Sequence, residues 1–282
     1  MWVFNTVINK IFDIFFFPFR KLSPWFAMIF ISLLTAALML IVFRLTSNQK
    51  GIKRVKNLIK AHLLEIRLYK GNMSVSFKAQ GKILLTNLKY ISYTLKPLLI
   101  MIVPLVLILI QLNLWFGHHS LEPGAQTILK VHLRQKIDPF AADLKILPSP
   151  VFEVETHPLR ISENNEIDWR IRADKEGHHN LNLMVDGRPI SKSLIVGSNS
   201  LAKVSTSRTN NKFFDLLFNP GESPIPGDTP ISSIEIQYPE KKFDLFGWKI
   251  GTFIGVPGWL WIYFVLSIIF AFAFKGLFKV DI

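Results

Sequence analysis

The sequence predicts a helical membrane protein that carries an all-β extracytoplasmic domain. Two observations indicate this fold class: 50% of the 282 residues are hydrophobic and many gather in three long apolar stretches, and the segment before the last stretch changes from helical to strand-like periodicity. A chain this apolar is not expected to be disordered, and its length allows about two domains. The chain has no cysteine, which excludes disulfides, thiolate nucleophiles and cysteine-bound zinc.

Residues 1–23 are predicted to form an amphipathic helix on the membrane surface. Asn5 and Asn9 interrupt the segment, which therefore lacks the apolar core of a cleavable signal peptide. Its apolar residues recur at helical spacing and would share one face: Val3, Phe4, Val7, Ile8, Ile11, Phe12, Phe15 and Phe16. Such a helix buries its apolar face at the lipid headgroup boundary. Pro18 would mark the turn towards the first apolar stretch, with Trp25 at the headgroup level.

Three apolar stretches are predicted to cross the bilayer, whose hydrocarbon core of about 30 Å takes roughly 20 helical residues. They are residues 24–43, 97–116 and 257–275. The first two contain no charged residue, and Pro104 is expected to kink the second. The alternative is a set of buried helices in a soluble core, but such helices are usually shorter or interrupted by polar residues.

The distribution of basic residues predicts the orientation of these three stretches. Residues 44–96 carry most of the net charge of +13, and Glu65 is their only acidic residue. Because short cytoplasmic loops are enriched in Lys and Arg, this loop is expected in the cytoplasm. The N-terminus and residues 117–256 would then lie outside, and the tail 276–282 would return to the cytoplasm. We expect a multi-pass protein of a bacterial-type inner membrane.

Residues 44–96 are predicted to form a helical hairpin. One helix runs from Asn48 to Tyr69, Gly71 and Asn72 form the turn, and a second helix returns to Leu95. The residues expected in the seam between the helices are Ile52, Val55, Ile59, Leu63, Ile66 and Tyr69 on the first, and Ile83, Leu84, Leu88, Ile91 and Leu95 on the second.

The outer face of this hairpin is expected to be strongly basic. It comprises Lys50, Lys53, Arg54, Lys56, Lys60, Arg67 and Lys70. A solvated face normally mixes both signs of charge, so this one indicates an anionic partner. Anionic headgroups, ribosomal RNA and an acidic nascent chain all fit the charge.

Residues 117–256 are predicted to form an antiparallel β-sandwich, immunoglobulin-like in shape but without a cysteine pair. Apolar residues alternate along residues 166–172 and again along 181–185, before the hairpin-turn signal Asp186-Gly187. Further strands are expected at residues 127–134, 151–156, 191–196, 201–206 and 232–238. The Pro- and Gly-rich residues 219–230 are expected to form a flexible connection or a partner-binding edge.

The sequence contains no motif that supports catalysis. The histidine pairs 118–119 and 178–179 follow glycines, and no H-x-x-x-H or H-E-x-x-H spacing places two imidazoles on one helix face. A G-x-S-x-G elbow, a P-loop and a dinucleotide fingerprint are also missing. We therefore expect no catalytic residue, no metal site and no cofactor.

The order of the predicted elements resembles the YidC/Oxa/Alb membrane insertase superfamily, including its three-span relatives. The resemblance covers residues 1–117 and is carried by the amphipathic helix, by the returning span and by the segment MLIVFRLTSNQKGIKRVKNLIKAHLLEIRLYKGN. It implies a membrane chaperone without a cofactor, whose spans form a polar groove for nascent or inserting membrane proteins. The basic hairpin would receive a ribosome, a targeting factor or the client itself.

The resemblance also implies candidate residues for the groove. In such insertases a basic residue lies near the cytoplasmic end of the first core span, where this chain has Arg44. A cation held in a low-dielectric groove attracts acidic or polar client segments, although an arginine at the end of a span can equally reach the headgroups. The other candidates are the polar residues within the spans: Ser32, Thr35, Gln111, Asn113 and Ser267.

One departure from the superfamily supports an alternative function. Its members usually join the second and third core spans by a short segment, whereas here residues 117–256 intervene. The alternative is an envelope scaffold without insertase activity, in which the external β-sandwich binds a protein or polysaccharide partner and the spans serve only as anchors.

Overall fold

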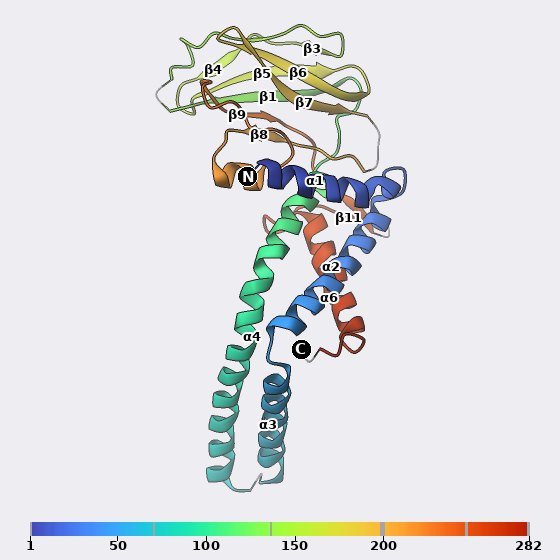
Figure 1. Cartoon of the computed structure of the whole chain (residues 1–282), viewed down its shortest axis with the longest axis vertical. Helices are drawn as coiled ribbons and strands as arrows, with labels where there is room; N and C mark the ends of the chain where they lie inside the picture. Colours follow the sequence, from blue (N-terminus) through green and yellow to red (C-terminus); the bar gives the residue numbers. More distant parts are fainter. Residues whose placement is uncertain (1, 70, 136, 198–200, 246–247, 281–282) are drawn as a thin grey trace. The chain divides into compact units, whose positions relative to one another are not determined.

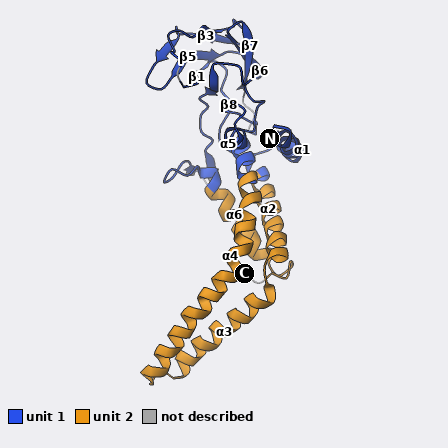
Figure 2. Cartoon of the chain, turned by 60° about the vertical axis from the view of Figure 1, so that its left-hand side comes forward, with its two compact units in different colours: residues 1–27, 108–260 blue, residues 28–107, 261–282 orange. Residues whose placement is uncertain are grey.

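The computed structural model describes residues 2–69, 71–135, 137–197, 201–245 and 248–280. The chain divides into two compact units (Figure 2). Unit 1 consists of Met1–Ala27 and Ile108–Leu260, and unit 2 consists of Met28–Leu107 and Trp261–Ile282. The chain therefore passes between the units inside three helices: α2 (Pro24–Thr46), α4 (Met73–Phe116) and α6 (Gly258–Phe274).

Unit 1 is built around antiparallel sheets (Figure 1). One sheet has the order β3-β5-β1-β9-β8, with β4 also paired to β5; a second has the order β2-β6-β7; and β10 pairs with β11. The strands are β1 Ala125–Leu133, β2 Leu144–Ile146, β3 Phe152–Val154, β4 Leu159–Ile161, β5 Glu166–Ala173, β6 Gly177–Val185, β7 Arg188–Val196, β8 Ser207–Thr209, β9 Ile231–Ile236, β10 Phe243–Leu245 and β11 Trp248–Ile250.

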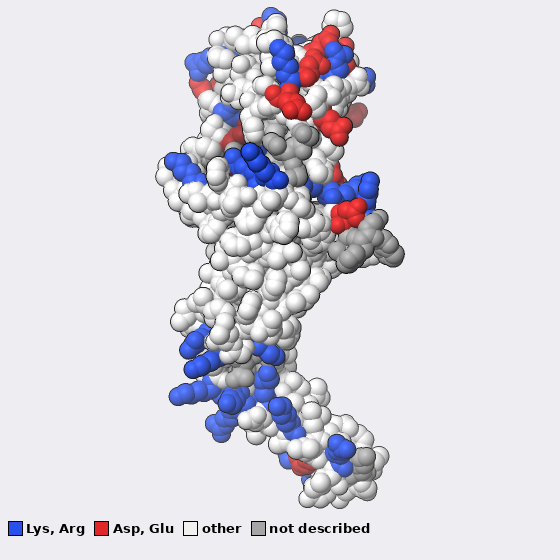
Figure 3. Space-filling view, turned by 90° about the vertical axis from the view of Figure 1, so that its right-hand side faces the viewer, with Lys and Arg blue, Asp and Glu red and all other residues white. Residues whose placement is uncertain are grey.

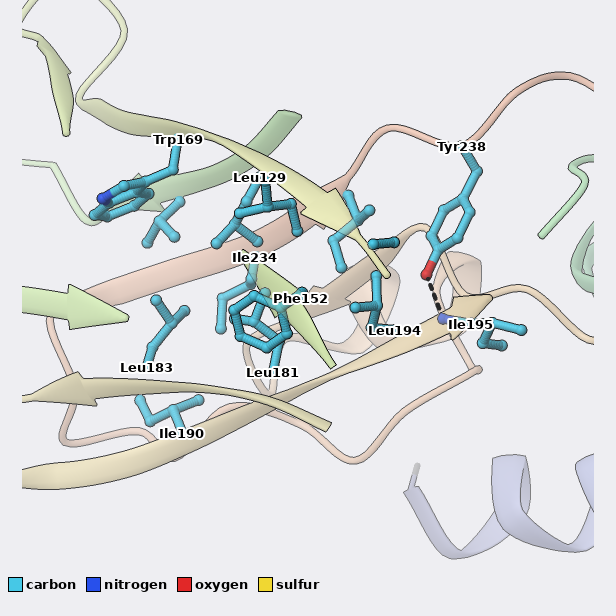
Figure 4. Packing of buried hydrophobic residues seen from close by; sticks show 14 of the residues in the cluster. Leu129, Phe152, Trp169, Leu181, Leu183, Ile190, Leu194, Ile195, Ile234 and Tyr238 are labelled. Atoms are coloured by element: carbon cyan, nitrogen blue, oxygen red, sulfur yellow. Dashed lines mark hydrogen bonds between the residues drawn. The ribbon is translucent and has the colours of Figure 1, made fainter. Parts of the chain in front are cut away.

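The first two sheets enclose a shared hydrophobic core (Figure 4). Leu129 of β1 and Ile171 of β5 meet Leu183 of β6 and Ile190 of β7, and each of the four is almost fully buried. At the edge of this core the backbone N–H of Ile195 donates a hydrogen bond of 3.1 Å to the Tyr238 hydroxyl. The predicted antiparallel sandwich is therefore present in unit 1.

The predicted hairpin at Asp186-Gly187 is confirmed, because both residues have positive φ angles, 48° and 76°, as a type I′ turn between twisted strands requires. The strand predicted at residues 201–206 is wrong. Val204 of this buried segment donates its N–H to the carbonyl of Leu114 at the end of α4, at 2.7 Å, and therefore joins no ladder. The short strands β2, β4, β8, β10 and β11 and the helix α5 (Phe213–Phe218) were not predicted.

The N-terminal helix α1 (Trp2–Phe16) and the short 3-10 helix η1 (Phe17–Phe19) belong to unit 1. The single apolar face predicted for α1 is only partly correct, because Phe12 and Phe16 turn into unit 1 with Asn5 and Asn9. The Phe16 ring lies 4.8 Å from that of Trp115. Phe12 and Phe16 therefore do not lie on the exposed face of α1. The other apolar side chains, among them Val3, Phe4, Val7, Ile11, Ile14 and Phe15, remain exposed.

Unit 2 contains α3 (Gln49–Leu68) and the larger parts of α2, α4 and α6. Helices α2 and α4 are long and apolar enough to cross a membrane, whereas α6, with 17 residues, is shorter. The predicted second hairpin helix and the predicted second span form one continuous helix, α4. It continues through Pro97 and Pro104, each of which removes only one backbone donor.

The predicted hairpin is present in unit 2. The Asn48 side chain caps α3 by accepting the N–H of Gly51 at 2.9 Å. Glu65 of α3 accepts hydrogen bonds from its neighbour His62 at 3.1 Å and from Lys82 of α4 at 3.3 Å. The Lys82 contact joins the two helices, and burial of Ile52 and Val55 on α3 agrees with the predicted seam. The seam prediction is wrong for Leu63 and Tyr69, which are 53% and 50% exposed.

The predicted seam is wrong for most of α4. Leu84, Leu88, Ile91 and Leu95 are 50% to 68% exposed. Of the predicted seam residues on α4, only Ile83 is half-buried. The other buried or half-buried positions between residues 73 and 96 are Val75, Ser76, Ala79, Thr86, Asn87, Tyr90, Tyr93 and Thr94. Most side chains on this side of α4 are small or polar, and the Glu65–Lys82 ion pair joins α3 to α4. The larger apolar side chains are left on the outside.

Candidate functional site

Four buried hydroxyl groups lie on two apolar helices of unit 2. Ser32 and Thr35 lie on the buried side of α2, and Tyr263 and Ser267 lie one turn apart on α6. The Tyr263 hydroxyl approaches Thr35 and Ser267. Within the described part of the chain, none of the four buried oxygens reaches a partner at hydrogen-bond distance and angle. We call these four residues the hydroxyl cluster.

The hydroxyl cluster is a costly arrangement for an apolar interior. Ser32 is 0%, Thr35 3% and Tyr263 0% exposed, and each polar group buried without a hydrogen bond costs about 1–3 kcal/mol. Apolar side chains of α2, such as Met28 and Leu40, are buried beside them. Among the described residues these hydroxyl groups make no hydrogen bond of standard geometry, and Thr35 and Ser267 lie close enough to interact with the Tyr263 hydroxyl.

The structure brings together three of the residues that the sequence singled out. Ser32, Thr35 and Ser267 belong to the hydroxyl cluster, whereas Tyr263 was missed because it lies in a stretch that was considered only for its apolar length. Its four-residue spacing from Ser267 places both on one helix face and was the available signal.

Gln111 and Asn113 belong to unit 1 and are not part of the hydroxyl cluster in unit 2. Gln111 is 3% exposed, and its Oε1 has no hydrogen-bond partner within the described residues. Asn113 is exposed. Because two residues correspond to about 200° of helix, these side chains point in different directions.

Arg44 is exposed in the last turn of α2. It follows Thr35 by about two and a half helical turns, at 3.6 residues per turn. The two side chains therefore project from opposite sides of α2, and Arg44 is not a member of the hydroxyl cluster. An arginine in this position is free to extend towards lipid headgroups or towards an acidic client.

The hairpin presents the predicted basic face. Lys50, Lys53, Arg54, Lys60 and Arg67 are exposed, whereas Lys56 is half-buried and Lys70 lies outside the described residues. In Figure 3 the hairpin shows many Lys and Arg side chains and few acidic ones, while both signs are mixed on the β-sheet region. A shallow groove on α3 is lined by the first three of these cations together with Asn57 and Leu58.

The exposed apolar side chains of α4 form a second feature of the hairpin. Leu84, Leu88, Ile91 and Leu95 follow one another at steps of four, three and four residues, so they share one face of the helix. We call them the leucine row. Alternating three- and four-residue steps are typical of a helix that packs against another helix. The exposed cations Lys78, Lys89 and Lys96 lie on the same helix.

Unit 1 contains histidines at the end of α4 and an open groove. Burial lowers the pKa of His118 and His119, which favours neutral imidazoles at pH 7. Within the described residues, no group of three or more His, Asp or Glu side chains is arranged to hold a metal ion. The groove is lined by His119, Glu122 and Arg170, among others.

Comparisons of the chain with protein-family models, with curated proteins and with solved structures found no match. The relation to the YidC/Oxa/Alb superfamily therefore stays a prediction that rests on the order of the elements.

Proposed function

We propose that this protein is a membrane-resident chaperone of the insertase type, which assists the insertion, folding or assembly of other membrane proteins. The hydroxyl cluster is the observation that carries this proposal, because it offers unused hydrogen-bonding groups inside an apolar helical unit. A client segment in transit contains peptide groups that lose their water on entering a bilayer, each at a cost of several kcal/mol. Transient hydrogen bonds to the cluster would reduce that cost.

The exposure of the apolar helices supports a membrane location. Only 39% of the apolar window of α2 and 22% of that of α4 is buried. A core helix of a soluble protein would bury most of such a window, because exposed apolar surface is unfavourable in water. We infer that α2, α4 and α6 cross the membrane, with the N-terminus and the sandwich outside and the basic hairpin in the cytoplasm.

The hairpin would supply the first contact with a client or its delivery partner. Its cations attract anionic groups over a Debye length of roughly 8 Å at physiological salt, and the leucine row offers an apolar surface beside them. Charge would speed the encounter, and apolar contact would add affinity. Neither contact needs a bound cofactor or a covalent step.

Photocrosslinking in native membranes tests the proposal. Benzoylphenylalanine would replace Phe43, beside Arg44, and in a second variant Lys60 on the hairpin. We expect short-lived crosslinks to many nascent membrane proteins or to the ribosome. A single stable partner, or no partner, would contradict a general insertase-like role.

A matched pair of variants tests the hydroxyl cluster itself. Thr35→Val, Tyr263→Phe and Ser267→Ala together remove three hydroxyls with little change in shape, and we expect several-fold fewer client crosslinks from position 43. The control carries the same three kinds of substitution on the hairpin part of α4: Tyr90→Phe, Ser92→Ala and Thr94→Val. Equal losses in both variants would contradict a role for the cluster.

The groove of unit 1 favours the scaffold as a second candidate function. Its lining combines the cation Arg170, the carboxylate Glu122 and the aromatic Tyr238, a mixture that suits a polar partner. Under this alternative, Arg170→Ala would remove a stable external partner, and the hydroxyl-cluster variant would have no effect. Under the insertase proposal, Arg170→Ala leaves the client crosslinks unchanged.

A further inference from the structure

Helix α5 and the N-terminal helix α1 together present an apolar surface on unit 1. On α1 it consists of Val3, Phe4, Val7, Ile11, Ile14 and Phe15, and on α5 of Phe213, Phe214 and Phe218. We propose that this α1–α5 surface inserts into the extracytoplasmic leaflet, so that the β-sandwich is held against the lipid by its own helix as well as by the spans. The inference rests on the proposed membrane location and adds a second lipid-binding element to it.

Hydrogen bonds from two asparagine side chains of α1 join this helix to backbone carbonyls of α5 and of the residues that follow it. The Asn5 side-chain amide donates to the carbonyl of Leu216 in α5, and that of Asn9 donates to the carbonyl of Pro220 just after it, both at 2.7 Å. Asp13 forms an ion pair with Lys203 of the β-sheet region at 3.1 Å. The position of α5 relative to α1 is therefore set by specific contacts within unit 1 (Figure 1).

The orientation of α1 differs from that of an ordinary amphipathic helix on a soluble protein, because Asn5 and Asn9 share its buried side with Phe12 and Phe16. Such a helix buries its apolar stripe against the protein and exposes polar residues to water. Here Asn5 and Asn9 are 3% and 7% exposed, whereas Val3 and Ile14 are 76% and 74% exposed. This arrangement is favourable when the surroundings on the exposed side are themselves apolar.

Helix α5 also exposes large apolar side chains. Leu216 is buried, whereas Phe213, Phe214 and Phe218 are 59%, 68% and 57% exposed. Three exposed phenylalanines in a helix of six residues are unfavourable in water, since burying one such side chain contributes about 1.5–3 kcal/mol. Lys212, directly before α5, and Lys10 on α1 are exposed cations that fit anionic headgroups.

A lipid leaflet is the occupant favoured by the position of this surface. Unit 1 contains the ends of the three apolar helices: residues 24–27 of α2, 108–116 of α4 and 258–260 of α6. The ring of Phe16, at the end of α1, lies 5.6 Å from that of Phe116, the last residue of α4. Helix α1 is thus attached where an apolar helix ends, and α5 is attached to α1.

Single-cysteine spin labels measure the depth of each position, and the chain has no native cysteine to remove. The full chain would be reconstituted in vesicles of phosphatidylethanolamine and phosphatidylglycerol, with labels at Phe4, Ile11, Phe213, Phe214 or Phe218. The control label replaces Phe140, which is 66% exposed in the β-sheet region and lies on neither helix. Collision with oxygen reports lipid, and collision with a water-soluble nickel chelate reports solvent.

We expect labels at 213, 214 and 218 to collide with oxygen as often as labels at 4 and 11, and the label at 140 to collide mainly with nickel. Nickel collisions at 213, 214 and 218 equal to those at 140 would overturn the inference. Protection from both reagents would also overturn it, because it would indicate a protein partner or a second copy. If labels at 4 and 11 also contact water, the proposed membrane location itself fails.

Discussion

Two buried lysines, Lys192 and Lys241, show how single residues hold unit 1 together. Lys192, 0% exposed, pairs with Glu222 and donates to the carbonyl of Ser205 at 2.7 Å. Lys241 donates to the carbonyl of Trp115 in the last turn of α4, at 3.3 Å. A cation is stabilised there by the negative end of the helix dipole. Because Lys192 is buried with its partner, removing Glu222 alone would leave an uncompensated charge.

The buried lysines predict a pH dependence of stability. Burial lowers the pKa of Lys241 from 10.5 to about 8 and also lowers the pKa values of Lys192 and Lys203. Between pH 8 and 10 the unfolded chain therefore binds more protons at Lys241 than the folded chain, so stability rises with pH in this interval.

The measurement is the thermal unfolding midpoint, Tm, of the full chain in lipid nanodiscs between pH 7 and 9.5. We expect Tm to increase over this range, and the increase to be smaller in Lys241→Met, which has no proton to lose. A Tm that falls as the pH rises in both proteins would contradict this prediction, because groups other than Lys241 would then determine the pH dependence of stability.

At the scale of elements, the hairpin differs most from expectation. Its turn and the burial of Ile52 and Val55 are as predicted, whereas the cap that Asn48 forms on α3 was not predicted. The outward direction of the leucine row on α4 was not predicted, and it exposes the kind of surface that usually packs against a helix. The hairpin therefore combines the net positive charge with an apolar surface that is open to a partner.

Replacing part of the leucine row tests this element. Leu84→Gln, Leu88→Gln and Ile91→Gln together should lower crosslinking from Lys60 several-fold with little change in Tm, because the side chains are exposed and Gln is a good helix former. The control replaces exposed leucines outside the row: Leu64→Gln, Leu68→Gln and Leu85→Gln. An equal loss of crosslinking in the control variant would contradict a specific role of the leucine row, because any exposed leucine of the hairpin would then support binding.

At the scale of the whole molecule, the distributions of charge and of apolar residues support the proposed topology. The net charge of +13 arises mostly from the hairpin, which belongs to unit 2, whereas the sandwich of unit 1 carries both signs. The hairpin follows the first span and the sandwich follows the second. If the three apolar helices cross the membrane, the hairpin and the sandwich therefore lie on opposite sides, because the chain crosses once between them.

Cysteine labelling with a membrane-impermeant maleimide tests this topology in intact cells. Phe140→Cys should react from outside, whereas Lys60→Cys should react only after permeabilisation. The reverse result would invert the orientation, and reaction of both sites in intact cells would contradict the three-span topology. The cysteine-free parent chain serves as the blank.

Much of the architecture follows from local patterns in the sequence. Apolar length predicted α2 and α4, a three- and four-residue period predicted α3, and two-residue alternation with Asp186-Gly187 predicted β6 and β7. These signals are local because backbone hydrogen bonding and side-chain direction repeat with the period of each element. The candidates Ser32, Thr35 and Ser267 were identified for a similarly simple reason, as polar residues in apolar stretches.

Tertiary packing decided which face each element turns inward. Tyr263 joins the hydroxyl cluster because α6 packs against α2, and Asn5 and Asn9 are buried because carbonyls of residues 216 and 220 accept their amides. The sequence by itself determined the long helices, the apolar stretches and the longer strands. Only the tertiary structure decided that the leucine row and the phenylalanines of α5 face outward, because that choice depends on partners distant in the chain.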